Sequence, residues 1–221
     1  MSTAPELADR PLRRDAERNR QRILAAAGEL FTERGLGVTL DDIARHAGVG
    51  VGTVYRRFPD KDALIDALFE EKIDRAVELA DRALEIEDPW EAFTTFMRGM
   101  CRMQAGDRGF KDALLVRDRG RERVAAARER IAPRAMKLLN RAQEAGAIRS
   151  DLGPFDVPML NLCVSLIADR TRDVAPDYWE RVLTIIIDGI SAQGPASPMP
   201  VEPLDRDTFT EAMASGRRRR S

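Results

Sequence analysis

Residues 39–58 decide the fold, and they read TLDDIARHAGVGVGTVYRRF. Thr39 followed by Asp42 resembles a capping box with Asp in place of Glu, which predicts a helix start. Gly48 ends this helix, because glycine accepts backbone conformations that strain other residues. Pro59 ends a second short helix. Two short helices that meet at a tight glycine turn have the layout of a helix-turn-helix.

The second short helix carries side chains suited to a polyanion. Gly50 and Gly52 let the backbone approach a phosphate or a base edge, and a helix N-terminus favours an anion. Val54 and Phe58 are expected to face inward. The polar side chains that gather on this helix are those of Thr53, Tyr55, Arg56 and Arg57. An arginine here can donate two hydrogen bonds to guanine or contact a phosphate.

Apolar residues at helical spacing predict further helices on both sides of this segment. The expected helices span residues 15–34, 39–47, 50–58, 60–87, 88–103, 110–117, 121–145, 155–172 and 177–192, with the seventh interrupted or bent at Pro133. After Gln193 the pattern gives way to prolines and small residues. We therefore predict an all-α fold of about nine helices, with an N-terminal three-helix domain followed by a helical bundle.

Charge is unevenly distributed along the chain. The net charge is −1, yet six arginines stand against Asp15 and Glu17 between Arg10 and Arg22. Four more arginines form the run Arg217–Arg220. Basic ends on a nearly neutral chain suit a protein that touches a polyanion with one region, although both segments could simply be solvated. We expect a flexible basic arm over 1–14 and a disordered Arg-rich tail over 194–221.

Composition excludes several classes of protein. With 43% hydrophobic and 33% charged residues, the 221-residue chain is expected to be globular. It has no apolar run long enough for a membrane span and no signal peptide, so we expect it in the cytoplasm. Two cysteines and one histidine exclude a disulfide scaffold, a Cys-ligated zinc site and a His-rich metal site. The sequence shows no phosphate loop or nucleophile elbow, so we expect no enzyme and no cofactor.

Several motifs together resemble one family. They are Ile23–Ala27 with Leu30-Phe31 and Gly35, Thr39–Ala44, Ala47–Val49, Gly52–Phe58 and Lys61–Leu64. This combination resembles the DNA-binding domain of the tetracycline-repressor (TetR) family of bacterial regulators over about residues 18–65. The resemblance implies a helix-turn-helix DNA-binding domain over 15–62 and a ligand-binding and dimerisation domain over 63–193.

The resemblance also assigns roles to individual residues. Thr39, Tyr55 and Lys61 match positions that usually contact phosphates. The matching surface that reads bases or backbone consists of Val51, Gly52, Thr53, Arg56 and Arg57. Arg45 is a further candidate, or else a solvated residue of its helix. The basic segment from Arg13 to Arg22 resembles arms that reach the backbone or minor groove.

The second half of the chain is expected to hold a mostly apolar effector and to dimerise. The candidate ligand residues are Phe93, Phe96, Met97, Met100, Cys101, Phe110, Leu114, Met136, Leu139 and Cys163, although ordinary core packing explains each equally well. The candidate interface residues, on two helices too apolar for a monomer surface, are Leu162, Leu166, Trp179, Leu183, Ile186, Ile187 and Ile190. The alternative is that they belong to a thicker core of the monomer.

These expectations combine into one function with two alternatives. The chain is expected to be a homodimeric repressor that binds a palindromic double-stranded operator and is released by a small-molecule effector. One alternative is a constitutive DNA-binding protein without an effector. The other is a redox-responsive regulator that uses Cys101 and Cys163, although both cysteines are expected to be buried.

Overall fold

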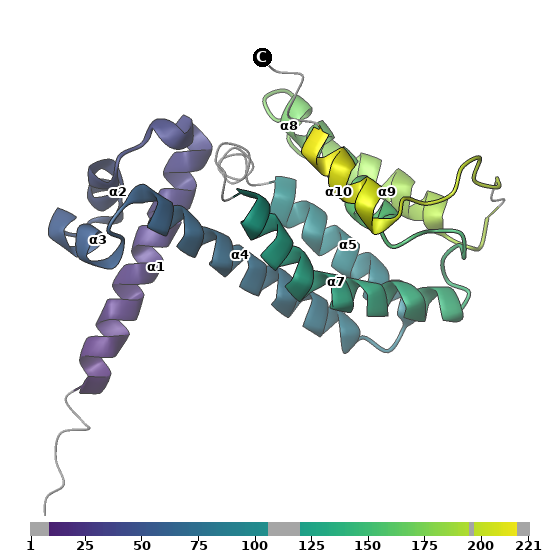
Figure 1. Ribbon diagram of the computed structural model, residues 1–221, viewed down its shortest axis with the longest axis horizontal. Coiled ribbons are helices and arrows are strands. Elements are labelled where there is room, and N and C mark those ends of the chain that lie inside the picture. The colour runs from purple at the N-terminus through teal and green to yellow at the C-terminus, as the bar shows by residue number, and fades with distance from the viewer. Residues whose placement is uncertain (1–8, 106–119, 195–196, 216–221) are drawn as a thin grey trace, which may run out of the picture. The chain divides into compact units, whose positions relative to one another are not determined.

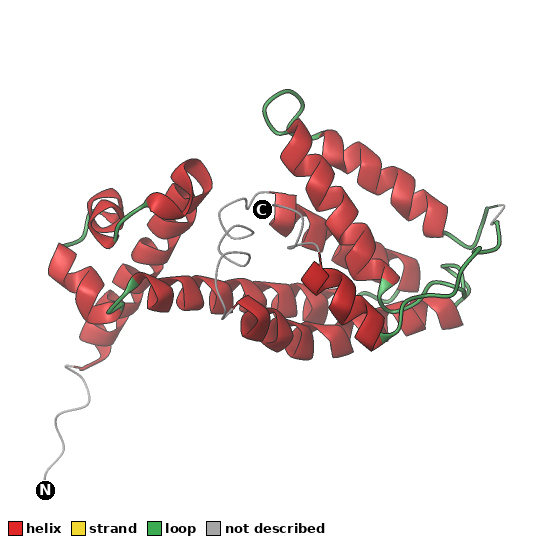
Figure 2. Cartoon of the chain, turned by 45° about the horizontal axis from the view of Figure 1, so that its top comes forward, coloured by secondary structure: helices red, strands yellow, loops and turns green. Residues whose placement is uncertain are grey.

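The computed structural model describes residues 9–105, 120–194 and 197–215 (Figure 1). Within these ranges the structure is helical and contains no strand, only a single bridge between Ile148 and Ser191 (Figure 2). The elements are α1 (Asp9–Arg34), the short 3₁₀ helix η1 (Gly35–Gly37), α2 (Leu40–Ala47), α3 (Val51–Arg57), α4 (Lys61–Leu84), α5 (Pro89–Ala105), α7 (Gly120–Glu144), α8 (Asp156–Thr171), α9 (Tyr178–Ile190) and α10 (Arg206–Ser215).

The all-α prediction is confirmed, and the described residues form nine α-helices. The predicted and described numbers of helices agree, but the helices themselves differ in two respects. The helix expected over 110–117 lies outside the described residues, whereas α10 was not predicted. The helix expected to be interrupted or bent at Pro133 continues through that residue as α7.

The described residues divide into two compact units. Residues 9–72 and 120–123 form the first unit, and residues 73–105, 124–194 and 197–215 form the second. The division falls inside α4, between Lys72 and Ile73, whereas the sequence placed the domain boundary between 62 and 63. The first turns of α4 belong to the first unit because their Leu64, Ile65 and Leu68 are buried in its core.

The core of the first unit joins α1, α2, α3 and the start of α4. Its fully or almost fully buried side chains include Ile23, Leu24, Ala27, Leu30, Phe31, Ile43, Ala44, Val54, Phe58 and Leu64. These residues recur three or four positions apart on α1 and α2, which is the spacing of one helix face. Burial of these faces against one another stabilises the short helices α2 and α3, which would be only marginally stable as isolated helices.

The core of the second unit is built mainly by α5, α7, α8 and α9. Its buried side chains include Phe93, Phe96, Met97, Cys101, Leu138, Leu139, Val164, Leu183 and Ile187. Helix α8 also brings Asn161 and Ser165 into this interior, and both are buried. Interior polar groups need partners, and Cys101 Sγ donates a hydrogen bond to Asn161 Oδ1 at 3.1 Å.

Arginines on α7 hold the second half of α4. Arg130 pairs with Asp74 at 2.5 Å and Arg134 pairs with Asp81 at 2.7 Å. Arg141 donates to the carbonyl oxygens of Leu84 at 3.3 Å and Ile86 at 2.7 Å, and also to that of Glu87. The last carbonyls of a helix lack partners within it, so Arg141 satisfies groups at the end of α4.

The prediction of a flexible arm over 1–14 is wrong from residue 9 onward, because α1 already begins at Asp9. Residues 1–8 lie outside the described part of the chain. Arg18 pairs with Asp15 and Arg20 with Glu17 within α1. Such pairs at i, i+3 support a helix and partly neutralise its arginines.

The prediction of a disordered tail over 194–221 is also wrong in part, because residues 206–215 form α10. Phe209 of α10 is buried and its ring stacks on Phe155, with ring centroids 4.9 Å apart. Arg149 Nη2 donates to the carbonyl oxygen of Ser197 at 2.7 Å. One aromatic residue inside a polar, proline-rich stretch anchors the segment, and the periodicity of the sequence did not reveal it. Residues 216–221, with the arginine run, lie outside the described residues.

Candidate DNA-binding surface

The start of α2 is fixed by the predicted capping box. The backbone N–H of Asp42 donates to Thr39 Oγ1 at 3.1 Å, and the backbone N–H of Thr39 donates to Asp42 Oδ2 at 3.1 Å. The Thr39 hydroxyl in turn donates to Asp42 Oδ2 at 2.6 Å. These bonds hold the pKa of Asp42 below its ordinary value, and the cause is chiefly the Thr39 hydroxyl.

The turn between α2 and α3 is set by Gly48 and by a contact from α1. Gly48 has φ 62°, in the left-handed region, and its N–H donates to the carbonyl of Arg45 at 3.2 Å. Arg22 Nη2 donates to the carbonyls of Ala47 at 2.7 Å and Gly48 at 3.2 Å. Arg22 was predicted as part of a DNA-contacting arm, and the structure instead shows it closing this turn.

Helix α3 is anchored on one side and open on the other. Val54 is completely buried and Phe58, just after the helix, is almost completely buried. The exposed residues of the helix are Val51, Gly52, Tyr55, Arg56 and Arg57, while Thr53 is half-buried. This seven-residue helix therefore presents together the side chains that the sequence singled out.

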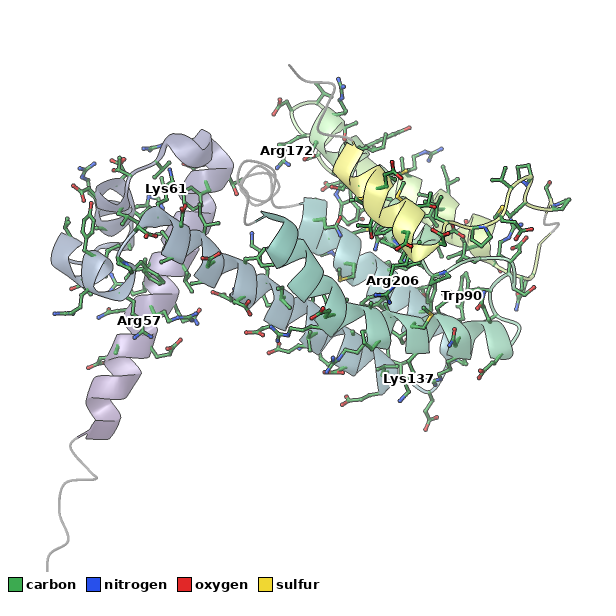
Figure 3. All side chains as sticks on the ribbon, in the orientation of Figure 1. Arg57, Lys61, Trp90, Lys137, Arg172 and Arg206 are labelled. Carbon is green, nitrogen blue, oxygen red and sulfur yellow. The ribbon has the colours of Figure 1, made fainter. Side chains whose placement is uncertain are left out.

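Several of the side chains assigned to DNA contact lie beside carboxylates of the first unit. Arg57 Nη2 lies 3.7 Å from Glu17 Oε2 of α1, and Figure 3 shows Arg57 beside that helix. Arg45 Nη1 lies 3.2 Å from Asp42 Oδ1. The negative charge of Asp41 raises the pKa of Tyr55 above its ordinary value.

Lys61 lies at the start of α4, where its ammonium sits 5.7 Å from the centre of the Phe31 ring (Figure 3). A cation over an aromatic face is held electrostatically, so Phe31 orients the Lys61 side chain. The sequence did not single out Asp41 or Glu17. The only signal for them was the presence of acidic residues at a helix start and within a basic segment.

Comparison with known proteins identifies the family. Residues 23–68 match the model of bacterial regulatory proteins of the tetR family, and residues 88–192 match the SbtR-like C-terminal domain of transcriptional regulators. The chain is 39% identical to a TetR regulator of known structure from Mycobacterium vanbaalenii, over 82% of this chain and 99% of that one, with a TM-score of 0.64. The chain belongs to the TetR family.

Further relatives agree with this assignment. A TetR transcriptional regulator from Streptomyces coelicolor is 32% identical, with 79% of this chain and 99% of that chain covered and a TM-score of 0.62. Helix-turn-helix transcriptional regulators from Staphylococcus aureus are 41% identical over 64 residues, or 28% of this chain. That alignment spans 35% of the length of these curated relatives. The matched families and relatives are DNA-binding transcriptional regulators and not enzymes.

The candidate ligand residues, inferred from the cluster of apolar side chains in the sequence, are only partly brought together. Phe93, Phe96, Met97, Cys101 and Leu139 are buried in the second core, and Met100 is half-buried against it. Phe110 and Leu114 lie outside the described residues. Met136 and Cys163 are exposed, so their assignment to the interior is wrong. Helix α8 turns Asn161 and Val164 inward, which leaves Cys163 on its outer side.

The candidate dimer residues, inferred from the apolar character of the last two helices, also separate into two groups. Trp179, Leu183, Ile187 and Ile190 are buried in the chain's own core, so they cannot face a partner as they stand. Ile186 is half-buried against that core and Leu162 is half-buried. Leu166 is 56% exposed. The sequence showed that α9 is apolar on several sides, but packing decided which side is internal.

The two cysteines differ in a way that can be measured. Burial raises the pKa of Cys101 to about 12, so its thiol stays neutral, whereas Cys163 is exposed. We expect iodoacetamide to alkylate Cys163 in the folded chain and to leave Cys101 unmodified until the chain unfolds, as read by mass spectrometry of peptides. Equal labelling of both in the folded chain would contradict the burial of Cys101.

In the described residues, no helix is long and apolar enough to cross a membrane. The same part of the chain holds no group of three or more His, Cys, Asp or Glu residues placed to bind a metal ion.

Proposed function

We propose that this TetR-family chain is a homodimeric repressor that reads a palindromic operator through α3 and is released by a small, mostly apolar effector. The observation that carries the proposal is the construction of α3. Val54 and Phe58 anchor one side, and Tyr55, Arg56 and Arg57 are exposed on the other. This arrangement places hydrogen-bond donors on the exposed side of α3, where base edges and phosphates can approach them.

A second copy of the chain is the partner we propose for the outer side of α8 and α9. One short reading helix spans few base pairs, and such readers gain affinity when two copies engage half-sites about 34–36 Å apart or a multiple of that. Exposed apolar side chains occur on both helices, with Leu166 on α8 and Tyr178 and Ile185 on α9. A twofold dimer would cover the same patch on each copy.

The effector site that we propose lies in the second core, near Met97 and Cys101. Phe93, Phe96 and Met97 of α5 are buried in this core and Met100 packs against it, and methionine adapts to different neighbours. The buried amide of Asn161 supplies polarity to this apolar surrounding. An effector must bind the two states of the repressor with different affinity if it is to release DNA.

Selection of bound sequences from random duplex DNA tests the function directly. We expect the purified chain to enrich a palindrome with two half-sites. Binding that depends on salt but enriches no sequence would contradict a sequence-specific regulator. Binding of an enriched operator that no apolar small molecule weakens would instead favour the constitutive DNA-binding protein.

Arginine substitutions on α3 test the reading surface. Arg56→Ala and Arg57→Ala should each weaken operator binding, by about 1–3 kcal/mol where the arginine contacts a base. The replaced residue should also relax the sequence preference at one position of each half-site. Lys61→Ala serves as a comparison, because loss of a phosphate contact weakens binding to all sequences and flattens the salt dependence. Unchanged operator binding by both arginine variants would show that α3 is not the reader.

A further inference from the structure

Exposed apolar side chains of the first unit are concentrated on α3. Where the structure describes the side chains of that unit, the large hydrophobic residues that are exposed are Val51 and Tyr55, with exposed fractions of 44% and 47%. Residues four positions apart lie on the same face of a helix, so both belong to the outer face of α3. The proposed reading face is therefore also the face on which this unit leaves apolar surface in water.

The Val51 side chain lies outside the described core of the first unit. Val49, in the preceding turn, packs against that core, and Val54 is part of it. Valine is also a weaker helix former than alanine, so an exposed valine at the first position of a seven-residue helix contributes little to folding. The Val51 side chain can gain from burial when a molecule outside the chain covers it.

The surroundings of Val51 favour the bases of a duplex as that cover. Gly50 and Gly52 stand on either side of it, and a Cβ added at Gly52 would meet no atom within 4 Å. Tyr55 and Arg56 are exposed one turn further along α3. In a helix-turn-helix the residues near the start of the reading helix are those that approach base edges in the major groove. Val51 is the first residue of α3.

The chemistry of the major groove identifies the partner. Base edges present hydrogen-bond donors and acceptors there, and thymine adds an apolar C5-methyl group. An isopropyl group neither donates nor accepts hydrogen bonds, so against a polar base edge it would cover groups without satisfying them. We propose that Val51 reads the methyl group of one thymine in each half-site of the operator, an inference that rests on the proposed function.

Replacement of thymine by uracil tests the proposal, because it removes the methyl group and keeps the hydrogen-bonding groups of the base. The enriched operator is prepared with one thymine position at a time replaced by uracil in both half-sites, and its affinity is measured. At one position we expect the affinity to fall about 15-fold, or about fourfold for each half-site, as is typical when one buried methyl group is lost.

Val51→Ala completes a double-mutant cycle with this change in the DNA. The variant should bind the thymine operator more weakly than the unmodified chain does. It should also reduce the ratio of thymine to uracil affinity at that position to about twofold or less, because the side chain that covers the methyl group is gone. Misfolding cannot imitate this result, since a smaller folded fraction lowers the affinity for both operators by the same factor.

Lys61→Ala is the matched control on the protein side. We assign Lys61 to a phosphate contact, and both operators have the same phosphates. Its loss should weaken binding to the thymine and uracil operators equally and leave their ratio unchanged.

The outcomes separate the inference from the proposed function. A methyl effect at one thymine that Val51→Ala removes and Lys61→Ala preserves supports the inference. An enriched palindrome in which no thymine shows such an effect would overturn the inference and leave the proposed function standing. Failure of the unmodified chain to enrich any sequence would overturn the proposed function, and the inference with it.

Discussion

Ile185→Asp should convert the proposed dimer to a monomer and weaken operator binding by at least about 100-fold. Ile185 is 63% exposed in the single chain, so the substitution does not disturb the chain's own core. In a twofold interface each change occurs on both copies, and both aspartates would be buried. Burial of an unpaired carboxylate costs several kcal/mol, which is more than a 100-fold loss requires.

The loss of operator affinity follows from the loss of the second reading helix. Two α3 helices held in one dimer engage their half-sites together, so the second contact is effectively intramolecular. A monomer keeps one α3 and its exposed Tyr55, Arg56 and Arg57. It should therefore retain weak binding that depends strongly on salt.

Light scattering provides the measurement, because the chain has a mass of 24.7 kDa and a dimer has twice that mass. Val201→Asp is the matched control, since Val201 is 76% exposed in the segment before α10 and lies outside α8 and α9. We expect the control to remain a dimer. A dimeric Ile185→Asp chain would show that the interface lies on another face.

Phe209→Ala should lower the free energy of unfolding by about 3 kcal/mol, as is typical when a buried phenylalanine is truncated. Phe209 is 4% exposed and stacks on Phe155 immediately before α8. The loop that precedes Phe155 is itself held by Gln143, whose side-chain amide donates to the Arg149, Ser150 and Leu152 carbonyls. Removal of residues 195–221 should be at least as costly. If the tail were disordered, the same truncation would leave the free energy of unfolding unchanged.

One substitution, made both in the full chain and in a chain truncated before residue 195, separates the contribution of the docked C-terminal segment from other effects of the substitution. A Cβ added at Gly153 would clash with Pro203 Cβ, because the two atoms would be closer than real contacts allow. Gly153→Ala should therefore destabilise the full chain by about 1–3 kcal/mol and cost much less in the chain truncated before residue 195. Chemical denaturation measures all four chains. Met213→Ala is the control on α10, the helix that carries Phe209. Met213 is 38% exposed, so this substitution should change the free energy of unfolding only slightly.

Local sequence signals were sufficient for the helix-turn-helix. The capping box, the turn glycine and Pro59 act within a few residues of the chain, so their effects can be inferred without knowledge of the rest of the fold. The inward direction of Val54 and Phe58 also follows from spacing, because residues four apart share a helix face. The same reasoning placed Tyr55, Arg56 and Arg57 on the outside, where the structure shows them.

Long-range packing limited the prediction in the second unit. Helix α9 is apolar on more than one side, and periodicity alone cannot say which side meets the chain's own core. The structure buries Leu183 and Ile187 and exposes Ile185. Cys163 and Met136 were misplaced for the same reason, because each lies on the exposed side of a helix whose other side is buried.

The sequence by itself determined that the protein is helical, that it carries a helix-turn-helix, and which side chains of α3 are exposed. These properties depend on interactions between residues that are near one another in the chain. Only the tertiary structure decided that Arg22 closes the α2–α3 turn, that Glu17 pairs with Arg57, and that α10 docks through Phe209. Each of these contacts joins residues 25 or more positions apart, and their partners are set by how the helices pack rather than by any local pattern.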